Sequence, residues 1–203
     1  MQIINNIQQG TPEWLQLRVG VFTATDGQTI ATKGKGLETL IYEKASEIIT
    51  GLSCEEAYTN SNIERGKELE EQARLFYEIE KNVTVETVAF VYGDLQHTGC
   101  SPDGLVGVDG LSEFKCPDNK NFVYICITDD YDKDYYWQCQ YQMFITKRKW
   151  ADLVFFNPNF NNPVKTFRIG RDEKSQITLK ENTEYAVNKA LEIVKQMQNI
   201  KAV

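Results

Sequence analysis

The sequence predicts an α/β (α+β) protein in which a central mixed β-sheet is flanked by helices. Two observations lead to this fold class: apolar residues recur at helical spacing over 61–80, and β-branched, partly alternating residues follow at once over 83–92. No internal repeat, low-complexity tract or long linker divides the 203 residues. We therefore expect one domain that spans residues 1–203.

Local signals place the predicted helices. The segment 11–18 begins with Thr-Pro, a pair typical of helix starts, and Gly51 is a suitable end for a helix over 37–50. Between them, the letters TKGKG predict a mobile basic loop at 32–36. Two further helices are expected over 134–147 and, with an amphipathic pattern, over 175–198.

The predicted strands lie in the middle of the chain and near its end. After the strand at 83–92, two shorter strands at 103–108 and 111–116 are joined by Val-Asp-Gly, a strong hairpin turn signal. A less regular, partly acidic stretch follows this hairpin. The remaining strands are expected over 151–156 and 164–169.

Composition excludes several classes of protein. The five cysteines are odd in number and contain no Cys-x-x-Cys pair, which argues against a disulfide framework or a zinc cluster and fits a reducing cytoplasm. No apolar run approaches the ~18 residues of a membrane span, so we expect a soluble, unexported protein. The formal net charge of −7 gives no overall basic surface, so contacts with a nucleic acid would have to be local.

One acid of the helix at 61–80 differs from its neighbours. At 100° per residue, Glu70 lies at the edge of the apolar stripe, whereas Glu71 falls on the solvated face. The stripe itself consists of Ile63, Gly66, Leu69, Ala73, Phe76 and Tyr77. A carboxylate directed inward needs a partner, because burying an isolated charge is costly.

The hairpin carries a second group of charged residues. Residues two apart in a strand share a face, so Glu113 and Lys115 point together, and the turn can bring Asp103 close to Glu113. Taken singly, a Glu-x-Lys pair on a strand is usually a solvent-facing ion pair, and an aspartate in SPDG is usually a turn residue. Together with Glu70, however, they form three hard oxygen ligands and one ammonium group.

Such a set suits Mg²⁺ or Mn²⁺, which prefer carboxylate and water ligands. The backbone carbonyl of Phe114, between the two charged side chains, is a further candidate ligand. A bound ion would lower the pKa of an attacking water and offset charge on a phosphodiester. Lys115 either holds or activates that water or neutralises the phosphate; its carboxylate neighbours favour the charged form and hence an electrostatic role.

Five segments in register resemble a known family. SPDG followed by EFK resembles the PD-(D/E)xK nuclease signature. The whole set is similar to lambda exonuclease and the YqaJ-like viral recombinases; its five segments are EWLQLRVGVFTATD, GKELEEQAR, CSPDGL, EFKCP and QCQYQMFIT. The likeness covers roughly residues 10–155. It implies a restriction-endonuclease-like core in a PD-(D/E)xK exonuclease domain. It also implies a phage or prophage origin and action in the bacterial cytoplasm.

The resemblance implies a 5′-to-3′ exonuclease that acts on ends of double-stranded DNA and leaves 3′ single strands for recombination by strand annealing. It also implies Mg²⁺, with Mn²⁺ as an alternative and two ions per site, a homotrimer that encircles DNA, and a single-strand annealing partner. By matching position, Asp103 and Glu113 would be metal ligands, Lys115 the catalytic lysine, and Glu70 the helix glutamate. Gln138 would help to position water or phosphate.

The resemblance also implies a pocket for the 5′-phosphate. Arg18 takes the place of the family's pocket arginine, and its fork of donors suits a phosphate. Ser101 matches a serine of that pocket, whereas Thr25 replaces the family's more usual serine and keeps a hydroxyl group. Lys33 and Lys35 of the basic loop are candidates for contact with DNA.

Two other functions remain alternatives at this point. A metal-dependent endonuclease of the same superfamily would share the catalytic core, because that core alone does not determine whether DNA ends are required. A non-catalytic module that binds DNA ends would lack an acid or the lysine, and none is missing here.

Overall fold

The computed structural model describes residues 1–54 and 61–200. Its helices are α1 (Pro12–Arg18), α2 (Gly27–Thr32), α3 (Lys35–Thr50), α4 (Ser61–Lys81), α5 (Asn119–Thr128), α6 (Lys133–Thr146) and α7 (Glu173–Asn199), with a short 3-10 turn at Ala24–Asp26. Its strands are β1 (Gln2–Ile4), β2 (Val85–Glu86), β3 (Phe90–Tyr92), β4 (Gly99–Cys100), β5 (Gly104–Val106), β6 (Gly110–Lys115), β7 (Trp150–Phe156) and β8 (Val164–Gly170).

Two sheets organise the chain. The larger has the order β2-β5-β6-β7-β8, in which only β6 and β7 pair in parallel; the smaller has the order β1-β3-β4 and is antiparallel. The parallel pair requires a crossover, which α5 and α6 supply. The structure thus confirms the predicted fold class, a mixed sheet flanked by helices.

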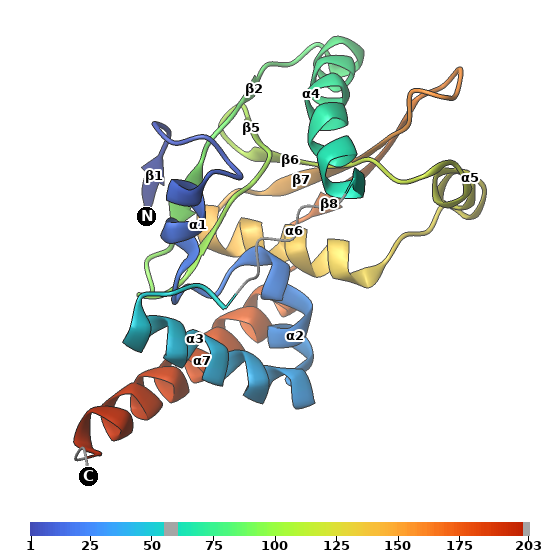
Figure 1. The fold of residues 1–203 in the computed structure, drawn as a ribbon. Coiled ribbons are helices and arrows are strands. Elements are labelled where there is room, and N and C mark those ends of the chain that lie inside the picture. The colour runs from blue at the N-terminus through green and yellow to red at the C-terminus, as the bar shows by residue number, and fades with distance from the viewer. Residues whose placement is uncertain (55–60, 201–203) are drawn as a thin grey trace.

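Helices cover both faces of the larger sheet, with α4 on one side and α6 on the other (Figure 1). The alternation of side chains along β6 separates two layers of contacts. Phe114 faces α4, where its ring lies 5.8 Å from that of Tyr77, whereas Glu113 faces α6 and accepts a hydrogen bond from Gln138. The strand that carries the predicted site therefore has an apolar face and a polar face.

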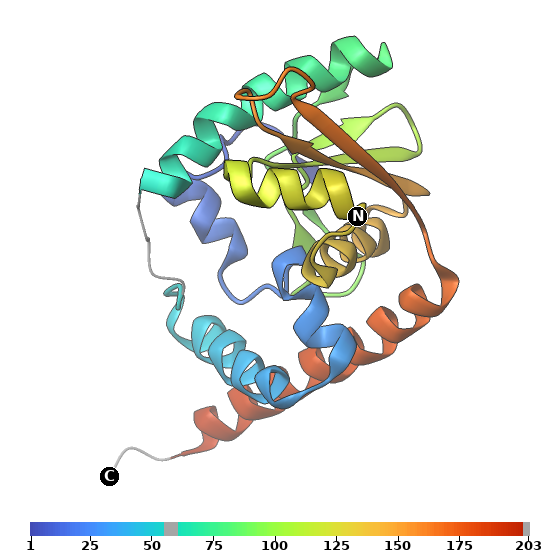
Figure 2. The ribbon, with the colours of Figure 1, turned by 90° about the vertical axis from the view of Figure 1, so that its right-hand side faces the viewer.

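Three helices form a further layer beyond α6. The helices α2, α3 and α7 pack on one another, and α2 and α7 also contact α6 (Figure 2). The main hydrophobic core fills the space from the sheet through α6 to these helices, while a smaller core lies under α4. In the described part of the chain, no helix is long and apolar enough to cross a membrane.

Most predicted elements are present within one or two residues. Gly51 ends α3 with a positive φ of 69°, as expected of a glycine at this position. The predicted strand at 83–92 is wrong as a single element, because it divides into β2, which pairs with β5, and β3, which pairs with β1 and β4. Sequence alternation does not indicate that one segment serves two sheets.

Two loop predictions are also corrected. The stretch after the hairpin contains α5, which Asp118 caps by accepting from the backbone N–H of Asn121 at 2.8 Å. Its β-branched residues, which have low helix propensity, obscured this helix. The predicted loop 32–36 is a tight turn, since α2 ends at Thr32 and α3 begins at Lys35.

Candidate active site

The end of β6 brings Glu113 and Lys115 together on the face toward α6. Lys115 Nζ donates to Glu113 Oε1 at 2.6 Å, and Gln138 Nε2 from α6 donates to the same oxygen at 2.6 Å. The Glu113 side chain is 3% exposed, whereas that of Lys115 is 25% exposed. A buried carboxylate thus lies behind an ammonium group that reaches solvent.

Asp103 joins this pair from the residue before β5. Its Oδ2 accepts from the backbone N–H of Phe114 at 2.7 Å, so the hairpin brings the two acids together as predicted. The turn differs in detail: Gly107 has a positive φ of 54°, and Gly110 already belongs to β6. Burial and, next, the charge of Glu113 raise the pKa of Asp103 well above its ordinary value.

Lys115 is held in its charged form. Burial alone would lower the pKa of its ammonium group, but the charges of Glu113 and Asp103 outweigh this effect and the pKa is raised. Its Nζ also lies 5.3 Å from the centre of the Tyr135 ring, a cation–π contact that favours the cation. In this structure Lys115 is therefore an ammonium group beside the carboxylates of Glu113 and Asp103.

Glu70 is less enclosed than the helical pattern predicts. Glu70 is exposed, so the buried environment that the pattern predicts for its carboxylate is wrong. It is nevertheless close enough to Asp103 for its charge to contribute to the raised pKa of that acid. Glu70 comes from α4, on the side of the sheet opposite to α6, toward which Glu113 points.

The two acids of the hairpin are suitable donors for a divalent cation. Among the side chains that the structure describes, no three from acidic, histidine or cysteine residues converge as a ready-made metal cage. The two acids at the hairpin are hard oxygen donors, and their mutual repulsion, seen in the raised pKa of Asp103, is what a cation would relieve. Asp103 and Glu113 fit such an ion, whereas ligation by Glu70 or by the Phe114 carbonyl remains a prediction.

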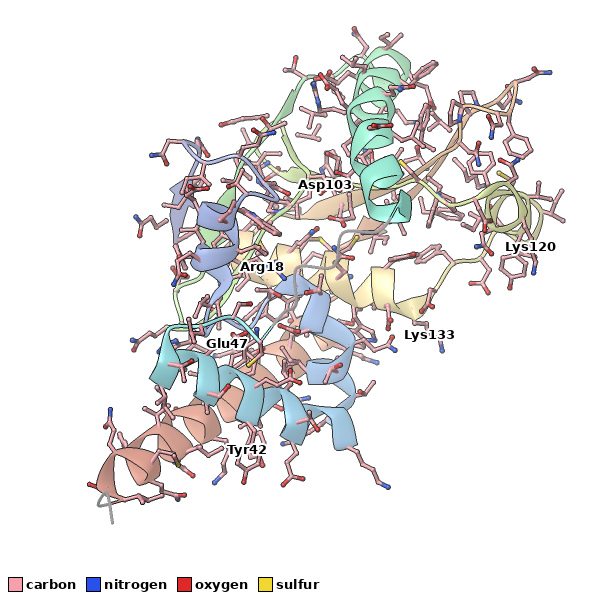
Figure 3. The ribbon with its side chains drawn as sticks, in the orientation of Figure 1. Arg18, Tyr42, Glu47, Asp103, Lys120 and Lys133 are labelled. Carbon is pink, nitrogen blue, oxygen red and sulfur yellow. The ribbon has the colours of Figure 1, made fainter. Side chains whose placement is uncertain are left out.

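Two of the three residues predicted for the 5′-phosphate, Arg18 and Ser101, contact the indole ring of Trp14. Trp14 Nε1 donates to Ser101 Oγ at 3.0 Å, and the Arg18 guanidinium lies 4.8 Å from the centre of the same ring. Thr25 is exposed and its hydroxyl lies 3.0 Å from that of Thr23. Figure 3 shows Arg18 and Asp103 in the middle of the molecule, with Lys120 and Lys133 toward its edge.

The two lysines predicted to contact DNA lie on the turn between α2 and α3. Lys33 has a left-handed backbone, φ 51°, and its Nζ lies 4.1 Å from the centre of the Tyr185 ring in α7. Lys35 begins α3 and is exposed. Their contact with DNA remains a prediction.

Sequence reasoning missed three residues that the structure places at the site. Trp14 joins Ser101 to Arg18, Tyr135 faces Lys115, and Gln142 donates to Glu113 Oε2 at 2.6 Å. The spacing of Gln142 from Gln138 was the available signal, because residues four apart share one face of a helix.

The comparisons with known proteins agree with this geometry. A family model described as the YqaJ-like viral recombinase domain matches residues 13–149. The chain belongs to this family. The resemblance drawn from the sequence is therefore confirmed. None of the curated proteins searched matches the chain.

Solved structures extend the likeness to nearly the whole YqaJ-like chain. The alkaline exonuclease LHK-Exo from Laribacter hongkongensis has a TM-score of 0.85 and 28% identity over 93% of this chain and 96% of its own. The same enzyme in complex with dAMP gives identical values. A phage-related exonuclease from Haemophilus somnus 129PT shares the fold, with a TM-score of 0.62 and 15% identity over 87% of this chain and 96% of its own.

Proposed function

We propose that this YqaJ-like protein is a metal-dependent 5′-to-3′ exonuclease that degrades one strand from the ends of double-stranded DNA. The observation that carries the proposal is the grouping of Asp103, Glu113 and Lys115 at the end of β6, with Gln138 hydrogen-bonded to Glu113. The family match and the likeness to an alkaline exonuclease support DNA as the substrate. The complex of LHK-Exo with dAMP supports release of nucleoside monophosphates.

Each residue of the site has a role in phosphodiester hydrolysis. Asp103 and Glu113 would hold Mg²⁺, or Mn²⁺ in its place, with Glu70 and the Phe114 carbonyl as further ligands of a two-ion site. The bound ion would supply an activated water and offset charge on the phosphate. Lys115, charged and partly exposed, stabilises the negative charge that develops on the phosphoryl oxygens. Gln138 keeps the Glu113 carboxylate in place.

A second set of residues gives the reaction its dependence on DNA ends. Arg18, with its planar fork of donors, would bind the terminal 5′-phosphate, and the Ser101 hydroxyl accepts a hydrogen bond from Trp14, the residue whose ring Arg18 contacts. Thr25 is the third candidate, and Lys33 and Lys35 would contact the duplex. Phage-type recombination in the bacterial cytoplasm, with a single-strand annealing partner, is the setting that this activity fits.

Digestion of an end-labelled linear duplex, with and without Mg²⁺, tests metal use, polarity and end-dependence together. We expect Mg²⁺-dependent loss of the 5′-labelled strand from linear DNA, while a closed circle stays intact. Cutting of the circle would show an endonuclease instead, and binding of ends without degradation would show a non-catalytic module.

Lys115→Ala tests the site assignment in the same assay. We expect kcat to fall by roughly 10²- to 10³-fold, the usual cost of losing a group that stabilises transition-state charge. Lys149→Ala is the matched control, because the Lys149 side chain is 71% exposed and pairs with Asp109 on the hairpin turn. Equal rates for Lys115→Ala and wild type would remove Lys115 from the mechanism.

A further inference from the structure

Gln142 lies on α6, one turn after Gln138, and is fully buried. Its Nε2 donates to Glu113 Oε2 at 2.6 Å, while Gln138 Nε2 donates to Glu113 Oε1 at the same distance. One face of α6 thus presents two amide groups to the two oxygens of a single carboxylate. Hydrogen bonds at both oxygens oppose rotation of the carboxylate about its last bond.

The orientation of the Gln142 amide follows from the chemistry of its partner. An ionised carboxylate only accepts hydrogen bonds, so the NH₂ group must face Glu113 and Oε1 must face away. That oxygen has no hydrogen-bond partner among the described residues, and an unsatisfied buried acceptor costs roughly 1–3 kcal/mol. An apolar side chain of similar size would fill the same space without this cost, so packing alone does not account for a glutamine.

We infer that Gln142 is a positioning residue that holds the Glu113 carboxylate ready for a divalent ion. This inference rests on the proposed function, because it takes Glu113 as a metal ligand. Glu113 Oε1 already accepts from Lys115 and Gln138, whereas among the described residues Oε2 accepts from Gln142 alone. A carboxylate has about four acceptor positions, so the one still open lies on Oε2, the oxygen that Gln142 orients.

The same helix offers a matched control. Gln140 is also fully buried, but its Nε2 donates to Gly170 O at 2.8 Å and its own oxygens accept from Gln176, so it ties α6 to β8 and α7. In the part of the chain that the structure describes, the Gln140 side chain makes no hydrogen bond with Asp103, Glu113 or Lys115. Loss of either amide should lower the stability of the fold, but only loss of Gln142 should change the affinity for a divalent ion.

The test measures Mn²⁺ binding to the folded, full-length protein by electron paramagnetic resonance of the free ion. For Gln142→Met we expect the Kd for Mn²⁺ to rise by roughly 10- to 100-fold, as is typical when a residue that supports a metal ligand is lost. For Gln140→Met we expect an unchanged Kd and a lower melting temperature. Circular dichroism verifies that each variant is folded.

A second variant, Gln142→Asn, tests the same inference if Gln142→Met does not fold. Gln142→Asn keeps the amide but is one methylene too short to reach Glu113, so its Kd for Mn²⁺ should also rise. If wild type binds Mn²⁺ and degrades DNA while the folded Gln142 variants match Gln140→Met in Mn²⁺ affinity, the inference is overturned and the proposed function stands. If wild type neither binds Mn²⁺ nor degrades DNA, the proposed function itself fails.

Discussion

The ionised carboxylate of Asp103 lowers the free energy of unfolding of the metal-free protein. Burial and two neighbouring acids raise the pKa of Asp103 above its ordinary value of 3.8. Between pH 3.8 and the raised pKa, Asp103 is therefore more protonated in the native protein than in the unfolded chain. Stability must therefore fall as the pH rises through this range. A bound cation, or the loss of the charge, would reverse the effect.

Asp103→Asn should consequently stabilise the metal-free protein while abolishing its activity. In EDTA at pH 8 we expect the melting temperature to rise by at least about 2 °C, because 1 kcal/mol corresponds to about 2–4 °C in a domain of this size. The gain should shrink toward pH 4, where Asp103 of the wild type is protonated. Differential scanning fluorimetry of both proteins between pH 4 and pH 8 measures these melting temperatures.

The control for this experiment is Asp109→Asn, which removes a carboxylate from the turn of the same hairpin, where the side chain is 44% exposed. It should not raise the melting temperature. A melting temperature for Asp103→Asn at or below that of wild type at pH 8 would contradict the interpretation of Asp103 as a destabilising acid.

Arg18 makes a separate prediction about recognition of DNA ends. Arg18→Ala removes the guanidinium and should reduce the preference for 5′-phosphorylated over 5′-hydroxyl ends by roughly 10- to 100-fold. A loss of this size corresponds to the free energy of one hydrogen bond to a charged group. Single-turnover digestion of the two substrates gives the ratio. Gln16→Ala, an exposed change on the same helix, should leave it unaltered, and an unchanged ratio in Arg18→Ala would count against the pocket.

At the scale of elements, the attachment of α4 to the sheet determines where Glu70 lies. Tyr77, two turns after Glu70, is fully buried and its hydroxyl donates to Asp152 Oδ2 at 2.7 Å. Arg168 on β8 donates to both oxygens of the same carboxylate at 2.7 Å. One buried acid on β7 thus links α4 and β8.

Tyr77→Phe should loosen this link with little change in shape. We expect a loss of about 1 kcal/mol, the usual net value of one hydrogen bond, and hence a melting temperature lower by about 2–4 °C. The matched control is Tyr42→Phe in α3 (Figure 3); Tyr42 is 58% exposed, so the loss of its hydroxyl should be neutral. Equal melting temperatures for the two variants would show that the hydroxyl of Tyr77 contributes nothing.

At the scale of the whole molecule, the net charge of −7 is spread over a protein that must approach an acidic polymer. The family resemblance implies a homotrimer that surrounds the duplex, an arrangement in which each subunit needs only local contacts with phosphate. Multi-angle light scattering should then give three times the 23.3 kDa of the chain at micromolar concentration. A monomeric mass would exclude the ring.

Features that depend on neighbouring residues in the chain were predictable from the sequence, whereas features that depend on distant residues were not. Local signals, such as Gly51 at the end of α3 and the alternation that pairs Glu113 with Lys115, act within a few residues and were predicted correctly. The division of 83–92 between two sheets depends on distant partners, because β2 pairs with β5 whereas β3 pairs with β1 and β4. The exposure of Glu70 likewise depends on neighbours outside its own helix. Periodicity measures which way a side chain points from its own helix, not what covers it.

The sequence by itself determined the fold class, the family and the chemical groups of the hairpin, because periodicity, turn residues and motif spacing are local properties of the chain. Only the tertiary structure decided that α6 faces the end of β6, and therefore that Gln142 as well as Gln138 reaches Glu113. It also decided that Trp14 contacts both Arg18 and Ser101. These contacts join residues far apart in the chain, and their positions depend on how helices and strands pack.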